Sequence, residues 1–315
     1  MTRPPVAIVY GYELAEYHFG DTHHFGPARQ YAFRDGFFGL GLEEQVEWLA
    51  PTPANIRTLQ TFHNPDYIME VHRKSQTGEG MLDYGDTPAR RGIFEAAVHV
   101  VGSVVELSDR IMKGEHRRGF VPIAGLHHAY PDHCSGFCVF NDTAVAIEHL
   151  RREYGLKRIL YVDIDAHHGD GVFYSYEHDP DIIVVDFHQY GDFFYPGTGD
   201  ADETGSGQAR GTKMNVPLAA GADDAVFAAH WARAEAFIRE MKPEFIFLQC
   251  GADSLAGDPI TQLQLSTASY RLAARSLCDL ADELCDGRLV GLGGGGYNLA
   301  NIEAAWPLVV REMLR

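Results

Sequence analysis

The sequence predicts an α/β fold, with a central parallel sheet that has helices on both faces. Short apolar runs alternate with longer helix-like segments along the whole chain, which is the pattern of repeated β-α-β units. Several of the apolar runs are continuous, as expected for strands buried on both faces. Gly- and Pro-rich segments follow some of these strands. The evenness of the alternation favours a single domain over residues 1–315.

The predicted elements follow in chain order. Strands are expected at residues 6–10, 46–49, 119–123, 159–162, 182–187, 245–249 and 289–292. Helices are expected at 93–112, 141–154, 223–241, 267–284 and 298–314. The first of these helices shows apolar residues at helical spacing. The second is expected to be capped by Asn141 or Asp142.

Composition narrows the class of partner. The net charge of −18, from 44 acidic and 26 basic residues, disfavours binding to nucleic acid phosphates. No apolar stretch is long enough for a membrane span, and the N-terminal run is too short for a signal peptide. Five cysteines in a chain of this size imply no disulfide framework, so a reducing, cytoplasmic compartment is expected.

The most informative segment directly follows the expected strand 159–162. Five ionisable side chains occur within eight residues: Asp163, Asp165, His167, His168 and Asp170. They fall at the carboxyl end of a parallel strand, where open α/β sheets bind their ligands. Packing so many carboxylates together is costly without a cation, and carboxylate plus imidazole suits a borderline ion such as zinc. The segment therefore predicts a metal site.

Three other strand-to-helix loops carry reactive side chains. His127 and His128 follow the strand 119–123, and Asp253 follows the strand 245–249. Four glycines, 293–296, precede Tyr297 after the last strand. Such a run can cradle a phosphate, but neither the G-x-G-x-x-G spacing nor a following Lys-Ser/Thr is present. The alternative is that the glycines let the backbone crowd an active site and bring Tyr297 into it.

Taken in order, His-His, D-x-D-x-H-H-G-D-G, G-A-D and G-G-G-G-Y-N resemble the zinc-dependent histone deacetylase family. The flanking segments HHAYPDHCSGFCVFND, FFYPGTGD and LQCGADSLAGDP match as well, over about residues 6–310. The wording SGFCVFND is similar to the class I branch. The resemblance implies an arginase-like α/β fold and metal-dependent hydrolysis of the amide of N-acyl-lysine, with acetyl-lysine the first candidate.

The resemblance also implies roles for the reactive residues. The zinc ligands would be Asp165, His167 and Asp253, with iron(II) as the alternative metal. His127 would pair with Asp163, and His128 with Asp170; His128 is favoured as general base and then acid, and His127 as mainly electrostatic. Tyr297 would donate its hydroxyl to the developing oxyanion.

A further group of residues is implied to contact the substrate. Gly136, Phe137 and Tyr195 match the tunnel around the acyl-lysine stem, although the family usually has Phe at the Tyr195 position and Phe194 is an alternative match. Asp86 matches a rim carboxylate. Ile260 stands where polyamine-specific relatives have Glu, which favours acyl-lysine. Arg29 matches an inner-channel residue, with His24 in place of the usual Pro.

The resemblance finally implies a structural potassium ion. Asp186 and Phe187 match positions that hold it, together with the backbone of Asp163, Asp165 and His167. The family usually has Ser or Thr where this chain has Asp186.

Three other functions remain open from the sequence. The first is an acetylpolyamine or other small-molecule amidohydrolase of the same fold, such as an acetoin-utilisation-type deacetylase. The second is a binuclear manganese ureohydrolase, which needs more carboxylate ligands. The third is a non-enzymatic acyl-binding protein. The sequence leaves the acyl group, the substrate and the oligomeric state undetermined, and it predicts no nucleic acid or membrane partner.

Overall fold

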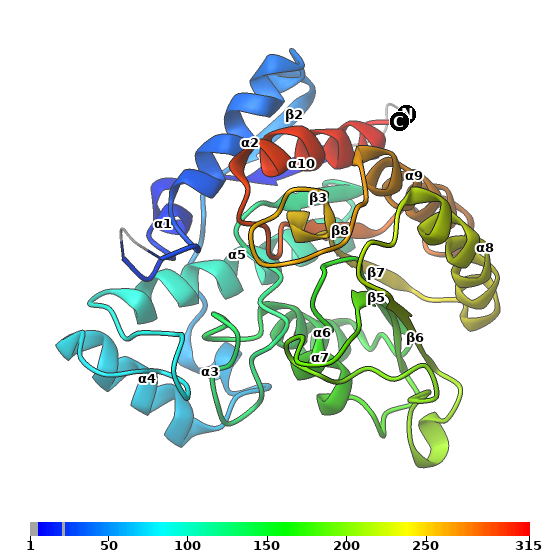
Figure 1. The fold of residues 1–315 in the computed structure, drawn as a ribbon. Helices are drawn as coiled ribbons and strands as arrows, with labels where there is room; N and C mark the ends of the chain where they lie inside the picture. The colour runs from blue at the N-terminus through cyan, green and yellow to red at the C-terminus, as the bar shows by residue number, and fades with distance from the viewer. Residues whose placement is uncertain (1–5, 21–22) are drawn as a thin grey trace.

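The fold is built on one parallel sheet of eight strands. The computed structural model describes residues 6–20 and 23–315. The strand order is β2-β1-β3-β8-β7-β4-β5-β6, and every neighbouring pair is parallel (Figure 1). The strands are β1 (Val6–Val9), β2 (Val46–Leu49), β3 (Arg118–Val121), β4 (Ile159–Asp163), β5 (Ile182–Gln189), β6 (Lys213–Leu218), β7 (Phe245–Gln249) and β8 (Leu289–Leu292). The predicted α/β class is confirmed.

Helices cover both faces of the sheet (Figure 1). One face packs against α1 (Tyr12–Ala15), α4 (Pro65–Thr77), α5 (Ile93–Met112), α6 (Asp142–Tyr154) and α7 (Asp170–Ser175), with α3 (Ile56–Leu59) beside α6. The other packs against α2 (Ala28–Gly39), α8 (Asp224–Met241), α9 (Thr267–Leu284) and α10 (Leu299–Met313). Short 3-10 turns lie at Glu43–Gln45, Gly207–Ala209 and Ala252–Ser254.

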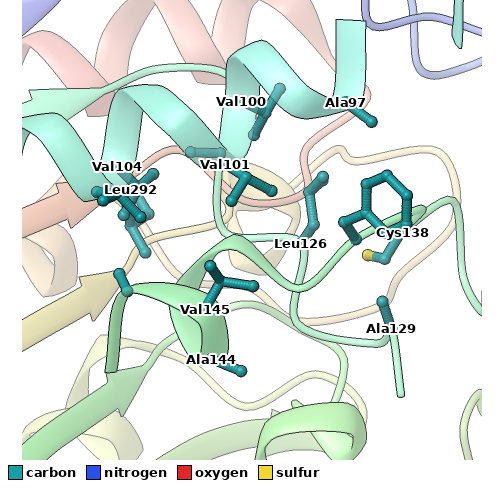
Figure 2. Close-up of a cluster of buried hydrophobic side chains, with 14 of the residues drawn as sticks. Ala97, Val100, Val101, Val104, Leu126, Ala129, Cys138, Ala144, Val145 and Leu292 are labelled. Atoms are coloured by element: carbon teal, nitrogen blue, oxygen red, sulfur yellow. The ribbon is translucent and has the colours of Figure 1, made fainter. Parts of the chain in front are cut away.

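The two faces form separate hydrophobic clusters because side chains alternate along each strand. In β4, Tyr161 points into one cluster, and Leu160 and Val162 point into the other. Figure 2 shows part of the first cluster, where side chains of α5 face α6 and the loop after β3. Strands buried on both faces explain why the apolar runs in the sequence are continuous.

The main difference from the sequence prediction is β6, which was not expected. Its sequence KMNVPL contains Lys213, Asn215 and Pro217, so it does not form an apolar run. β6 is one of the two edge strands of the sheet, where proline is tolerated because one side of the strand needs no ladder partner. Helices α2 and α4 were also not predicted. The cap of α6 is Asn141, whose side chain accepts from the Ala144 N–H at 2.9 Å.

The strand order determines where the reactive loops meet. Strands β3, β8, β7 and β4 are consecutive neighbours, and parallel strands end at the same edge of a sheet. The loops that carry His127, Tyr297, Asp253 and Asp165 follow these four strands in that order. In residues 6–20 and 23–315, we find no helix that combines the length and apolarity needed to cross a membrane.

Candidate active site

Asp165, His167 and Asp253 form a buried group that can hold a metal ion. One ligand atom from each lies within 4.8 Å of the others. His167 Nδ1 is 3.1 Å from Asp165 Oδ1 and 3.2 Å from Asp253 Oδ2. Burial lowers the pKa of His167, but the two carboxylates outweigh it and raise the value to about 10. Burial and Asp165 raise the pKa of Asp253 to about 7. This excess of negative charge is suited to a cation.

Glycines make room for these carboxylates. A Cβ atom on Gly295 would lie 2.2 Å from Asp253 Oδ2, and one on Gly251 would lie 2.0 Å from Asp165 Oδ2. The Gly295 N–H instead donates to Asp165 Oδ2 at 2.8 Å, as does Gln249 Nε2 at 2.8 Å. Sequence reasoning missed Gln249, although a polar residue at the end of an apolar strand is a detectable signal. The glycine run therefore packs against the group of Asp165, His167 and Asp253 and does not form a phosphate loop.

The two adjacent histidines each pair with a different carboxylate. His127 Nδ1 is 2.7 Å from Asp163 Oδ2, and His128 Nδ1 is 2.6 Å from Asp170 Oδ1. The two rings lie 4.0 Å apart. Burial, and then the neighbouring His127, lower the pKa of His128. Burial opposes the charge on Asp170, but His128 outweighs it and holds the pKa of Asp170 below its usual value.

Three side chains that hold this pair were not found from the sequence. Asp142, which the sequence suggested as a helix cap, accepts from the Gly125 and Leu126 N–H groups, both at 2.7 Å. It thus fixes the loop that carries the histidines. Tyr161 donates to Asp163 Oδ2 at 2.5 Å, and Tyr130 donates to Asp170 Oδ2 at 3.1 Å.

A narrow cavity leads from the surface to these groups. Its volume is about 110 Å³, and it is lined by Asp86, His128, Gly136, Phe137, His167, Tyr195, Ile260 and Tyr297. A wider outer cavity of about 340 Å³ shares Asp86, Gly136 and Tyr195 with it. The structure therefore brings five of the six expected substrate-contact residues to one channel, beside the group of Asp165, His167 and Asp253.

Of the two candidate tunnel residues, Tyr195 and Phe194, the cavity is lined by Tyr195. Tyr195 lines both cavities, and its ring packs edge-on to His128 with centroids 5.0 Å apart. Phe194 stacks on His167, with centroids 5.0 Å apart and an interplanar angle of 10°. Gly136 and Phe137, which also line the channel, both have positive φ, 52° and 65°. A Cβ on Gly136 would lie 2.4 Å from the His128 ring, so only glycine fits there.

Tyr297 and Arg29 both lie next to the glycine run, and the Arg29 guanidinium carbon is 5.8 Å from the centroid of the Tyr297 ring. The Tyr297 N–H donates to Asp258 Oδ2 at 2.8 Å. Burial and Asp253 raise the pKa of Tyr297 well above its usual value, so its hydroxyl remains a donor at neutral pH. Arg29 is outside the channel. It is buried, and it donates to the carbonyls of Gly296 at 2.8 Å and Gly294.

Asp86, the expected rim carboxylate, belongs to a tight acidic turn. Asp83 accepts from the N–H groups of Gly85, Asp86 and Thr87 at 2.9–3.1 Å. Burial and the neighbouring Asp83 raise the pKa of Asp86 to about 6. His23 Nε2 lies 3.2 Å from the Asp86 carbonyl and connects this turn to the preceding loop.

The residues expected to hold a monovalent cation include Asp163, whose carboxylate pairs with His127, and Asp186. Asp186 Oδ2 accepts from the Gly169 N–H at 2.9 Å, and Oδ1 is 2.8 Å from His188 Nδ1. Burial, and then the nearby Asp186 and Asp165, raise the pKa of Asp163 well above its usual value. The Phe187 side chain packs against Phe227 and Trp231, with ring centroids 4.8 and 5.4 Å away.

A parallel α/β fold with a buried carboxylate–imidazole group that can hold a metal ion is typical of metal-dependent hydrolases. More narrowly, the chain belongs to the histone deacetylase family, because residues 23–313 match the histone deacetylase domain. The predicted resemblance is therefore confirmed, and the protein is a hydrolase of the deacetylase type.

Named relatives share most of the chain. The acetoin utilization protein AcuC of Bacillus subtilis (strain 168) is 33% identical over 318 residues, covering 97% of this chain and 81% of that protein. Histone deacetylase 8 of Xenopus tropicalis is 32% identical over 279 residues, covering 84% of this chain and 72% of that protein. AcuC of Staphylococcus aureus (strain MRSA252) is 31% identical over 317 residues, covering 98% of this chain and 81% of that protein.

Proposed function

We propose that this protein is a zinc-dependent deacylase that hydrolyses the amide of N-acyl-lysine, with acetyl-lysine as the first candidate substrate. The observation that carries the proposal is the position of Asp165, His167 and Asp253. Their ligand atoms lie within 4.8 Å of one another, and His167 lines the same narrow cavity as His128 and Tyr297. Two carboxylates and one imidazole neutralise a divalent ion and leave positions open for water and substrate.

The metal is proposed from the chemistry of the donors. This donor set fits zinc, with iron(II) as the alternative. When bound, the metal would polarise the substrate carbonyl and lower the pKa of a bound water. Asp165, His167 and Asp253 would hold it, and the Gln249 and Gly295 N–H groups would orient the Asp165 carboxylate.

His128 is the proposed general base. Its Nδ1 is hydrogen-bonded to Asp170, so Nε2 is the ring nitrogen that can accept a proton. Because burial and His127 lower the pKa of His128, the ring is neutral before the reaction and can accept the proton of the attacking water. The same nitrogen then gives that proton to the leaving amine. His127, held by Asp163, would stabilise negative charge electrostatically.

Tyr297 is the proposed oxyanion donor. Its hydroxyl is protonated at neutral pH and its ring lines the channel beside His128 and His167. A hydrogen-bond donor directed at the oxygen on which charge develops lowers the activation barrier without strengthening substrate binding in the ground state. Asp258 would keep Tyr297 in place through its backbone N–H.

The channel is proposed to hold the lysine stem. Phe137 and Tyr195 offer aromatic walls for the methylene chain, Gly136 makes room between them, and Ile260 adds an apolar contact without charge. Asp86 at the rim is proposed to accept from the backbone amides of a peptide. Arg29, which donates to carbonyls of the glycine run, is proposed to act on an inner channel.

A second candidate substrate is an acetylated polyamine or another small acetylated amine. Among the residues that the structure describes, Asp83 and Asp86 line the outer cavity and no lysine or arginine does, so this cavity favours a cationic group next to the acyl amide. Ile260 lacks the carboxylate that would bind a second amine in the channel, and for this reason we place acyl-lysine first.

Three further assignments belong to the same proposal. We propose that residues 1–315 act as one catalytic domain in a reducing, cytoplasmic compartment. We also propose that Asp163 and Asp186 flank a structural monovalent cation, with backbone carbonyls of Asp165, His167 and Phe187 as the other ligands. The support is the repulsion between these buried carboxylates, which a cation would relieve. A saturable rise of Tm with potassium but not with tetramethylammonium would support this site.

The decisive experiment compares substrates on one protein preparation. Purified protein is stripped with a chelator, reconstituted with zinc or iron(II), and assayed with acyl-lysine peptides, N-acetylputrescine and N-acetylspermidine. The expected result is metal-dependent hydrolysis, inhibited by a hydroxamate, with a higher kcat/KM for an acyl-lysine peptide than for either polyamine. A higher kcat/KM for a polyamine would support the second candidate, and no hydrolysis of any amide would contradict both.

A further inference from the structure

We propose that Tyr130 is a positioning residue for this hydrolysis and that it acts on His128 through Asp170. The inference rests on the proposed function, in which His128 is the general base. The Tyr130 hydroxyl donates to Asp170 Oδ2 at 3.1 Å. The other carboxylate oxygen, Oδ1, lies 2.6 Å from His128 Nδ1. Each oxygen of Asp170 is thus held by a different side chain.

The hydrogen bond from Tyr130 matters because Asp170 is buried and its carboxylate rotates easily about the Cβ–Cγ bond. Asp170 is only 5% exposed. Carboxylate rotation about the Cβ–Cγ bond has broad, shallow preferences, so a single hydrogen bond fixes its plane poorly. With Oδ2 held by Tyr130, Oδ1 stays directed at His128 Nδ1. That bond in turn fixes the tautomer and the ring orientation of His128.

Tyr130 is itself held firmly enough to serve as an anchor. Its backbone N–H donates to the His133 carbonyl at 3.0 Å. Its ring stacks on the His133 ring, with centroids 4.5 Å apart and an interplanar angle of 10°. Burial and Asp170 raise the pKa of Tyr130 above its usual value, so its hydroxyl is a donor throughout the neutral range. The hydroxyl therefore keeps both its place and its proton.

The other histidine is supported differently. Tyr161 donates at 2.5 Å to Asp163 Oδ2, which is the same oxygen that lies 2.7 Å from His127 Nδ1. Both groups there contact one oxygen of Asp163, whereas Tyr130 and His128 contact separate oxygens of Asp170. This asymmetry agrees with different roles for the two histidines. It also makes Tyr130 the better test site, because Tyr161 is fully buried in β4 and Tyr130 is half-buried on a loop.

The chain contains a matched control for the substitution. Tyr154 donates to Asp109 Oδ1 at 2.9 Å, and the same oxygen lies 2.7 Å from His149 Nε2. This Tyr-Asp-His group joins α5 and α6 and lines neither the inner nor the outer cavity. Tyr154→Phe therefore removes the same kind of hydrogen bond from a place outside the reaction.

The first test is kinetic and uses the full chain reconstituted with zinc. Tyr130→Phe is expected to lower kcat about 10-fold, the usual size for a group behind a catalytic side chain, and to leave KM nearly unchanged. Zinc content should match that of the unmodified protein. Tyr154→Phe should keep the original kcat. In a protein that already carries Asp170→Asn, Tyr130→Phe should have no further effect, because it acts only through that carboxylate.

The second test needs no turnover. The downfield proton resonance of His128 Nδ1–H, assigned by its loss in His128→Gln, should shift in Tyr130→Phe and stay in place in Tyr154→Phe. An unmoved resonance, an unchanged kcat, or an equal loss of kcat with and without Asp170→Asn would each overturn the proposal. Because the resonance is read in the resting enzyme, it tests Tyr130 even if the unmodified protein fails to hydrolyse the peptide. That failure would contradict only the proposed function.

Discussion

The Tyr195 hydroxyl lies 2.5 Å from Ser135 Oγ at the point where the outer and inner cavities meet. This bond fixes the ring of Tyr195, whose edge-on contact with His128 has a centroid distance of 5.0 Å. The ring thus forms one wall of the narrow channel next to the proposed base. A phenylalanine would form the same wall but would lack the bond to Ser135.

The first prediction separates the ring of Tyr195 from its hydroxyl. Tyr195→Ala should raise KM for an acyl-lysine peptide about 10-fold, because roughly 1.5 kcal/mol of apolar contact with the lysine stem is lost. Tyr195→Phe retains the ring and should keep KM close to the original value. Zinc content should stay the same in both variants. Equal KM values for the alanine variant and the unmodified protein would remove Tyr195 from the channel wall.

The second prediction concerns Tyr297. Its hydroxyl contributes only when charge develops on the carbonyl oxygen, so Tyr297→Phe should lower kcat about 100-fold with little change in KM. Zinc should stay bound, because Tyr297 is not among the proposed ligands. Steady-state kinetics together with metal analysis checks both statements. If Tyr297 only packs against the glycine run, phenylalanine fills the same space and kcat stays near its original value.

The third prediction compares zinc binding after loss of a proposed ligand, Asp253, with zinc binding after loss of a nearby carboxylate, Asp258. Asp253→Ala should lose bound zinc and activity together, since it removes one of three protein ligands. Asp258→Asn is the matched control. Asp258 accepts a hydrogen bond from the Tyr297 backbone and is not one of the proposed zinc ligands. The Asp258→Asn variant should therefore retain zinc even if kcat falls. Metal analysis after dialysis distinguishes the two, and normal zinc content in Asp253→Ala would exclude Asp253 as a ligand.

Much of the site was predictable because its reactive residues directly follow strands. The loops after β4, β7 and β8 must meet at one edge of a parallel sheet, so Asp165, Asp253 and Tyr297 could be grouped without coordinates. The continuous apolar runs marked the central strands in the same way. The edge strand β6 carries Lys213 and Pro217 and lacks that signal.

The supporting contacts were not predictable, because they depend on where packing places isolated side chains. Tyr130 and Asp170 are 40 residues apart, and nothing in their local sequences couples them. Asp142 was expected only as a helix cap, yet the loop that follows β3 brings the Gly125 and Leu126 N–H groups to its carboxylate. Arg29 matched a family position, but its hydrogen bonds to the glycine run could be found only from the structure.

A buried histidine outside the site, His63, is expected to make the free energy of unfolding depend on pH. His63 is 1% exposed, and its Nε2 accepts from the Asn141 N–H at 2.9 Å. Asn141 in turn caps α6. Burial lowers the pKa of His63 from 6.5 to about 3, because a charged ring would lose its contact with water and could no longer accept this bond.

The last prediction follows from the sign of that shift. Between pH 6.5 and about 3 the unfolded chain binds a proton at His63 that the folded chain does not, so the free energy of unfolding falls as the pH falls. The slope from this residue approaches about 1.4 kcal/mol per pH unit. In His63→Gln the slope, measured by urea denaturation of metal-free protein at pH 7 and 5, should be smaller. Exposed His178→Gln is the control and should keep the original slope. Identical slopes in all three proteins would show that His63 does not stay neutral in the folded state.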